Sequence, residues 1–185
     1  MIASLDEDVV QRVNDLGTTT WSGTMHRYTS TGRDPRSGIG ARLFGGRWNP
    51  RDVFPTIYLS HPAAACIAEL DRTAAASSLP VPMMIRKGLT LHVLAVREMQ
   101  VLDLREPSAL RQVGLGMEDI SDEDWTACQA VGHAAYFLDF DGVLAPSATG
   151  TGLVLAAFET RLRPEQLTVE QAEPLSENLY QRLHV

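Results

Sequence analysis

The stretch TIYLSHPAAACIAELDRTAAAS, residues 56–77, decides the fold because a short strand pattern runs directly into a helix pattern. Residues 56–60 form a short apolar run, as in a buried strand. Residues 61–77 are rich in alanine, the strongest helix former. Ser60 is placed to cap this helix, and Pro62 fits its first turn. The stretch therefore predicts a sheet against which helices pack.

The flanking sequence predicts an α+β fold. Helices are expected at residues 6–16, 122–139 and 176–183, and strands at residues 25–30, 90–96, 99–104, 142–147, 152–159 and 167–172. We also expect a glycine- and arginine-rich loop at 31–47, a turn at 97–98, and acids in the first turn of the helix at 122–139. The strands are rich in Val and Leu but alternate only in part. They predict a mixed sheet with flanking helices rather than a regular βαβ arrangement.

Length and composition indicate an ordinary globular protein. The 185 residues are enough for one well-buried core and show no shift in composition, so residues 1–185 are expected to form a single domain. No apolar run approaches the roughly 18 residues of a membrane span, and the N-terminus is acidic where a secretory signal is basic. We therefore expect a cytoplasmic protein without a membrane partner. Cys66 and Cys128 lie in alanine-rich segments and suggest two small buried side chains rather than a disulfide or a metal site.

Charge is distributed unevenly along the chain. Residues 27–51 contain six arginines against a single acid, Asp34, a local balance of +5 that leaves −12 for the rest of a chain whose net charge is −7. General nucleic-acid binding needs a broad basic face, so this distribution argues against direct contact with nucleic acid. One concentrated cluster instead focuses a positive field on a small area. It predicts a small anionic ligand.

The segment FGGRWN, residues 44–49, is the first candidate for chemistry. Gly45 and Gly46 can adopt backbone conformations closed to other residues and can let a ligand come close, while Arg47 offers a planar, permanently charged fork. The same pattern also fits a surface turn whose arginine caps a carbonyl or pairs with an acid. The motif alone leaves both interpretations open.

Glu69 and Ser147 are the other polar candidates. The helical neighbours of Glu69 are Ala65, Cys66 and Thr73, all small and none basic, so its carboxylate is either solvated or faces a pocket. Ser147 follows a strand and a proline in APSATG, where a hydroxyl either ends a loop near a site or stabilises the turn.

The ordered motifs resemble a known family. HRYT (26–29), GARLFGGRWNP (40–50), IYLS (57–60) and ACIAELDR (65–72) are similar in sequence and spacing to the RES domain, the toxin half of Xre–RES bacterial toxin–antitoxin pairs. The similarity extends to DWTACQAVGHAAYF (124–137) and GLVLAAFETRLRP (152–164), so it covers nearly the whole chain. The asparagine–proline pair that often follows the last core strand of the family is replaced here by FETRLRP.

This resemblance implies a fold similar to the ADP-ribosyltransferase toxins and cleavage of the nicotinamide–ribose bond of NAD. NAD is then a substrate rather than a cofactor, and inorganic phosphate is the expected co-substrate. Water and protein are the other acceptors known in the family, which leaves an NAD glycohydrolase and a protein ADP-ribosyltransferase as alternatives. A non-catalytic nucleotide-binding module is a further alternative. The implied partner is an Xre-type antitoxin in a hetero-oligomer.

The resemblance also assigns roles to residues of this chain. Arg27 and Arg47 are expected to bind the pyrophosphate through charge-assisted hydrogen bonds. Glu69 is expected to bind a ribose hydroxyl and to face the positive charge of an oxocarbenium-like transition state. Tyr28 and Tyr58 are expected to stack against the nicotinamide. The family is named for an arginine, a glutamate and a serine. The serine is matched either by Ser147 in APS or by the hydroxyl of Thr126 in DWTAC.

Overall fold

The computed structural model describes residues 4–184, in which helices surround a six-stranded sheet. The strands are β1 (Thr19–Ser30), β2 (Thr56–His61), β3 (Leu89–Asp103), β4 (Gly142–Pro146), β5 (Leu153–Phe158) and β6 (Leu167–Pro174). The helices are α1 (Glu7–Leu16), α2 (Ile39–Phe44), α3 (Ala63–Ser77), α4 (Val81–Arg86), α5 (Pro107–Gln112), α6 (Met117–Ser121), α7 (Thr126–Phe137) and α8 (Glu177–Leu183). Two short 3-10 helices, η1 (Glu159–Arg161) and η2 (Pro164–Gln166), lead into β6.

The sheet is mixed and closes on itself. Its strand order is β1-β2-β5-β4-β3-β6, and β1 also pairs with β3, so five strands form a ring to which β6 is added at the edge of β3. The pairing of β3 with β4 is parallel and the other pairings are antiparallel. Closure leaves few free strand edges. The expected α+β fold with a mixed sheet and flanking helices is confirmed.

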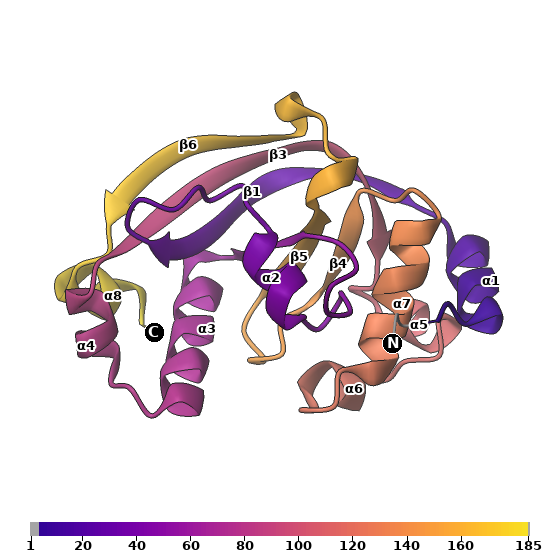
Figure 1. Ribbon diagram of the computed structural model, residues 1–185, viewed down its shortest axis with the longest axis horizontal. Coiled ribbons are helices and arrows are strands. Elements are labelled where there is room, and N and C mark those ends of the chain that lie inside the picture. The colour runs from indigo at the N-terminus through magenta and orange to yellow at the C-terminus, as the bar shows by residue number, and fades with distance from the viewer. Residues whose placement is uncertain (1–3, 185) are drawn as a thin grey trace.

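Helices cover the sheet in two groups. In Figure 1, α3, α4 and α8 lie at one end of the curved strands β1, β3 and β6, and α1, α5, α6 and α7 lie at the other end. The short helix α2 lies between the groups, next to β4 and β5 in this view. Both cysteines are buried and free, as expected from their alanine-rich surroundings.

The strand β2 separates two of the hydrophobic clusters of the core. Ile57 and Leu59 pack into the cluster that also contains Met25 and Leu155. Tyr58 lies on the opposite face because successive side chains of a strand alternate, and it packs against the cluster formed under α1 and α7. This alternation turns Tyr58 away from the interior of the ring, toward the segment that precedes β2.

Two strands predicted at 90–96 and 99–104 are one continuous strand, β3, and the turn predicted between them is wrong. Arg97 and Glu98 interrupt the apolar pattern, but the chain passes through them in a bulge, with φ of 48° at Glu98. The Glu98 backbone N–H donates to Ser22 Oγ at 2.8 Å, where the pairing with β1 also shifts. Pairing with the long strand β1 therefore keeps β3 continuous through Arg97 and Glu98.

The helix predicted at 122–139 begins only at Thr126, so the expected acids are not in its first turn. Asp122 and Asp124 use their carboxylates locally instead: each accepts the backbone N–H two residues later, from Asp124 at 3.0 Å and from Thr126 at 2.9 Å. Such side-chain bonds favour a turn over a helix. Asp122 and Asp124 therefore lie in the turn that precedes α7.

Other boundaries also differ from the sequence predictions. Ser60 belongs to β2 and does not cap α3, whose N-cap position is Pro62. The predicted loop at 31–47 contains α2, and β1 begins six residues before the predicted strand at 25–30. The helices α4, α5 and α6 were not predicted, because each has only five or six residues and shows little periodicity. Among residues 4–184, no helix is both long and apolar enough to cross a bilayer.

Gly132→Ala is expected to destabilise the protein, although alanine is ordinarily the better helix former. Gly132 lies in α7 against the backbone of Trp48, and an added Cβ would overlap the Trp48 carbonyl oxygen. Overpacking of this kind costs about 1–3 kcal/mol. The matched control is Gly40→Ala in α2, where a Cβ meets nothing within 4 Å. Thermal unfolding should show a lowered midpoint for Gly132→Ala alone; equal midpoints would show that this contact does not constrain the packing.

Candidate active site

Arg47 lies in a tight turn between α2 and β2. Gly46 and Asn49 form an isolated β-bridge in which the Gly46 N–H donates to the Asn49 carbonyl at 3.0 Å and the Asn49 N–H donates to the Gly46 carbonyl at 3.3 Å. Arg47 and Trp48 are the two residues at the tip of this turn. Gly46 is required there because a Cβ would overlap the Tyr58 hydroxyl. We call residues 46–49 the arginine turn.

The side chain of Arg47 is buried, with only 9% of the residue exposed. Its Nη1 donates to the carbonyl of Asp119 at 2.9 Å, and its guanidinium lies 5.8 Å from the centre of the Trp125 ring. Within the described part of the chain, no carboxylate forms an ion pair with it. Arg47 thus caps a carbonyl, as in the second interpretation of the motif, but it is buried rather than on the surface and pairs with no acid. The site instead holds a desolvated positive charge that lacks a counter-ion.

Tyr58 holds the arginine turn from β2. Its hydroxyl donates to Asn49 Oδ1 at 2.7 Å and accepts the Trp48 N–H at 2.9 Å. Burial raises the pKa of Tyr58 well above its ordinary value, so the hydroxyl stays protonated. Its single hydrogen is therefore donated to Asn49 and is not available to a ligand.

Glu69 and Ser147 are brought together from α3 and the β4–β5 connection. The Ser147 hydroxyl, in a residue only 4% exposed, donates to Glu69 Oε1 at 3.3 Å and lies 2.8 Å from Thr149 Oγ1. Glu69 is partly buried, and among residues 4–184 it forms no ion pair. Of the two interpretations of Glu69, full solvation does not fit, because the carboxylate is partly buried and lies against the Ser147 hydroxyl.

Tyr28 reaches the same helix from β1. Its hydroxyl donates to Thr73 Oγ1 at 3.2 Å, and Thr73 in turn donates to the carbonyl of Glu69 at 2.9 Å. Burial raises the pKa of Tyr28 above its ordinary value and raises that of the nearby Cys66 thiol to about 12. Cys66 therefore stays a thiol at neutral pH and is no nucleophile. Tyr28 is thus linked through Thr73 to the backbone of Glu69.

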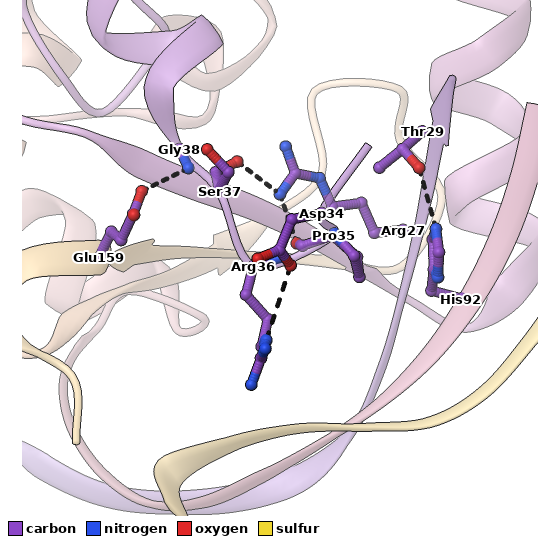
Figure 2. A network of polar contacts seen from close by, with 9 residues as sticks. All are labelled: Arg27, Thr29, Asp34, Pro35, Arg36, Ser37, Gly38, His92 and Glu159. Atoms are coloured by element: carbon purple, nitrogen blue, oxygen red, sulfur yellow. Dashed lines mark hydrogen bonds and ion pairs between the residues drawn. The ribbon is translucent and has the colours of Figure 1, made fainter. Parts of the chain in front are cut away.

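Arg27 holds the loop that precedes α2. Its Nη1 donates to the carbonyls of Pro35 and Ser37 at 2.6 and 3.0 Å, while the Gly38 N–H donates to Glu159 (Figure 2). Burial lowers the pKa of Arg27, but an arginine remains charged at any physiological pH. One nitrogen of Arg27 is therefore occupied by the chain itself, while Nε and Nη2 form no hydrogen bond within residues 4–184; its role in pyrophosphate binding stays a prediction.

Thr126 forms no side-chain hydrogen bond with Glu69 or Ser147 within the described residues. It is exposed at the start of α7, next to Trp125, whose ring faces Arg47. Of the two candidates for the family hydroxyl, Ser147 contacts Glu69, whereas Thr126 follows Trp125, whose ring faces Arg47. A cavity of about 500 Å³ is lined by residues between 107 and 119, including Asp119, whose carbonyl binds Arg47. In the described residues, no group of His, Cys, Asp and Glu side chains is arranged to bind a metal.

Comparison with known proteins identifies the family. Residues 21–177 match the RES domain. The chain belongs to the RES domain family. It is 50% identical over 183 residues to the NAD(+) phosphorylase MbcT of Mycobacterium tuberculosis and to that of Mycobacterium bovis, covering 99% of this chain and 98% of each relative. It superposes on the crystal structure of the M. tuberculosis MbcT–MbcA toxin–antitoxin complex with a TM-score of 0.91, at 50% identity and with 98% and 99% of the two chains covered.

Three residues that support this RES site were not found from the sequence. Asn49 is fully buried and binds Tyr58, Trp125 faces Arg47, and Gln129 Nε2 donates to the Gly46 carbonyl at 2.9 Å. Asn49 next to a proline fits an ordinary turn equally well, and the helical pattern around Trp125 and Gln129 does not show what their side chains contact. The only sequence signal for Asn49 is its place within the family motif GGRWN.

Proposed function

We propose that this protein is the toxin of a cytoplasmic toxin–antitoxin pair and that it degrades NAD by phosphorolysis. NAD and inorganic phosphate would react to ADP-ribose 1″-phosphate and nicotinamide. The observation that carries the proposal is the pair of unneutralised charges, the buried guanidinium of Arg47 and the carboxylate of Glu69 held by Ser147. The names of its 50% identical relatives as NAD(+) phosphorylases support the same reaction.

Arg47 supplies the binding site for the anionic part of NAD. A buried guanidinium without a counter-ion gains strongly when a phosphate oxygen replaces water around it, because charge-assisted hydrogen bonds are strong in a poorly solvated site. Trp125 shields one side of the guanidinium, and Nη1 is fixed on the Asp119 carbonyl. The nitrogens not used by Asp119 are the donors for the pyrophosphate. Arg27 fixes the loop before α2 through Nη1, and its remaining nitrogens are further donors for the pyrophosphate.

Glu69 acts on the bond that breaks. Nicotinamide in NAD is already cationic and leaves as a neutral molecule, so no general acid is needed. As its bond to the ribose lengthens, positive charge develops on the ribose ring, and the Glu69 carboxylate stabilises this charge and binds a ribose hydroxyl. Phosphate oxygen then forms the new bond to the same carbon. Ser147 orients the carboxylate through the bond to Oε1, and the rings of Tyr28 and Tyr58 hold the nicotinamide.

Ser147→Ala is expected to lower kcat for nicotinamide release by about threefold, the lower end of the effect of one hydrogen bond, because the bond to Glu69 Oε1 is long at 3.3 Å. Thr126→Val should change kcat by less than about twofold, because a single exposed hydroxyl contributes little to positioning. Initial rates of both variants, measured at saturating NAD, decide between the two hydroxyls. The reverse ranking would assign the family serine's role to Thr126.

An antitoxin partner is part of the proposal, since a free NAD-degrading enzyme would harm its own cell. The solved relative is itself in a complex with an antitoxin. Beside the site, α2 exposes three apolar side chains, Ile39 (47%), Leu43 (48%) and Phe44 (81%). Exposed apolar groups of this kind are typical of protein interfaces. We propose that an antitoxin of the Xre type covers this helix in a hetero-oligomer.

Nicotinamide release tests the proposed function. Purified protein is incubated with NAD and phosphate, and nicotinamide is quantified by chromatography against time. We expect release to equal the NAD consumed and to continue over many turnovers. Folded protein that binds NAD but releases no nicotinamide would instead be a non-catalytic nucleotide-binding module.

A further inference from the structure

We propose that Gln129 of α7 is a positioning residue for NAD binding, because its side-chain amide fixes the turn that carries Arg47. The inference rests on the proposed role of Arg47. It assigns a function to a residue that touches neither Arg47's guanidinium nor the Glu69–Ser147 pair, and that acts through the backbone of Gly46.

The bond from Gln129 is the better of the two that the Gly46 carbonyl accepts within the chain. Gln129 Nε2 donates to it at 2.9 Å, whereas the Asn49 N–H that closes the arginine turn donates at 3.3 Å. Hydrogen bonds of this type weaken as the distance exceeds about 3.2 Å. Without Gln129, the carbonyl at the start of the turn would keep only the longer bond.

The two ends of the arginine turn are held by different elements. At its far end, Asn49 is tied to α2 through Nδ2, which donates to the Ala41 carbonyl at 2.8 Å, and to β2 through the Tyr58 hydroxyl. At its near end, Gly46 is tied to α7 by Gln129. The position of Arg47 relative to α7 therefore depends on this one side chain and on the packing of Trp48 against Gly132.

Gln129 also shares a helix face with the aromatic partner of Arg47. Trp125, the N-cap residue of α7, precedes it by four residues, and the Trp125 carbonyl accepts the Gln129 N–H at 2.8 Å, which places the two residues one helical turn apart. The Trp125 ring faces the Arg47 guanidinium, and the Gln129 amide binds the carbonyl of Gly46, the residue before Arg47. Together they orient Arg47 before NAD arrives, so that less conformational freedom is lost when the pyrophosphate binds.

Gln129→Met is the test variant, because it removes the amide donor and keeps the length of the side chain. We expect KM for NAD to rise by about three- to tenfold, in line with the loss of one partly buried hydrogen bond, and kcat to change by less than about threefold. Gln129→Glu, which replaces the donor by an acceptor, should also raise KM. Gln112→Met is the matched control, since Gln112 is exposed in α5 and forms no side-chain hydrogen bond within residues 4–184. Its KM should equal that of the wild type.

A double-mutant cycle separates positioning from a general structural role. If Gln129 acts through Arg47, Gln129→Met should have no further effect on KM in an Arg47→Ala background. The dissociation constant of ADP-ribose, measured by calorimetry, provides the same comparison without turnover, and thermal unfolding shows whether each variant is folded. Equal effects of Gln129→Met in both backgrounds, or an unchanged KM, would overturn the inference while the wild-type activity stands. A wild-type protein that neither binds nor cleaves NAD would overturn the proposed function as well.

Discussion

Glu69→Gln is expected to lower kcat for nicotinamide release by about 100- to 1,000-fold while KM for NAD changes by less than about threefold. The amide keeps the shape of the side chain and can still contact Ser147 and a ribose hydroxyl. It lacks the negative charge that stabilises the developing positive charge on the ribose. Because this charge appears only in the transition state, its loss should affect kcat rather than substrate binding.

The control for this variant is Glu173→Gln in β6, where the glutamate is exposed and forms no ion pair within the described residues. It should retain the wild-type kcat. Circular dichroism and thermal unfolding of Glu69→Gln should match the wild type, because Glu69 takes no part in the three buried clusters of the core. A folded Glu69→Gln protein with near-normal release of nicotinamide would remove Glu69 from the mechanism.

Arg47→Ala should have the second largest effect, a rise in KM for NAD of about 10- to 100-fold, since hydrogen bonds to charged groups contribute about 1.5–3 kcal/mol. The phosphate contacts exist in both the ground state and the transition state, so kcat should fall much less. Arg47→Lys keeps the charge but loses the fork, and its KM should lie between those of the wild type and the alanine variant.

Arg42→Ala is the matched control for Arg47, because Arg42 belongs to the same arginine-rich segment but is exposed on α2. Initial rates over a range of NAD concentrations give KM and kcat for each variant. If Arg47→Ala kept the wild-type KM, or if Arg42→Ala raised it equally, binding would depend on the general positive field rather than on the buried guanidinium.

Much of the fold could be predicted where the pattern is local. The strand at β2 and the alanine-rich α3 follow from a single stretch, and Glu69 is set within that helix by its small neighbours. The continuity of β3 could not be predicted, because its bulge at Glu98 is stabilised by Ser22 on a partner strand. Arg97 and Glu98 look like a turn in the sequence, but pairing with β1 on both sides of the bulge keeps them within β3.

Local sequence patterns also could not predict which residues bind the arginine turn and Glu69. The sequence separation between Gln129 and Gly46 is 83 residues, and the one between Ser147 and Glu69 is 78. Contacts of this range depend on how the ring of strands brings α3, α7 and the β4–β5 connection together. Local sequence could single out Arg47 and Glu69 as chemical groups, but it could not show that Arg47 is buried without a counter-ion.

The mass of the product formed from NAD tests the central claim most directly. Purified protein is incubated with NAD in the presence and absence of inorganic phosphate, and the products and the protein itself are analysed by mass spectrometry. The account predicts ADP-ribose 1″-phosphate as the main product, formed in proportion to the nicotinamide released and only when phosphate is present. Free ADP-ribose formed at the same rate without phosphate, or an ADP-ribosyl group attached to protein, would contradict it.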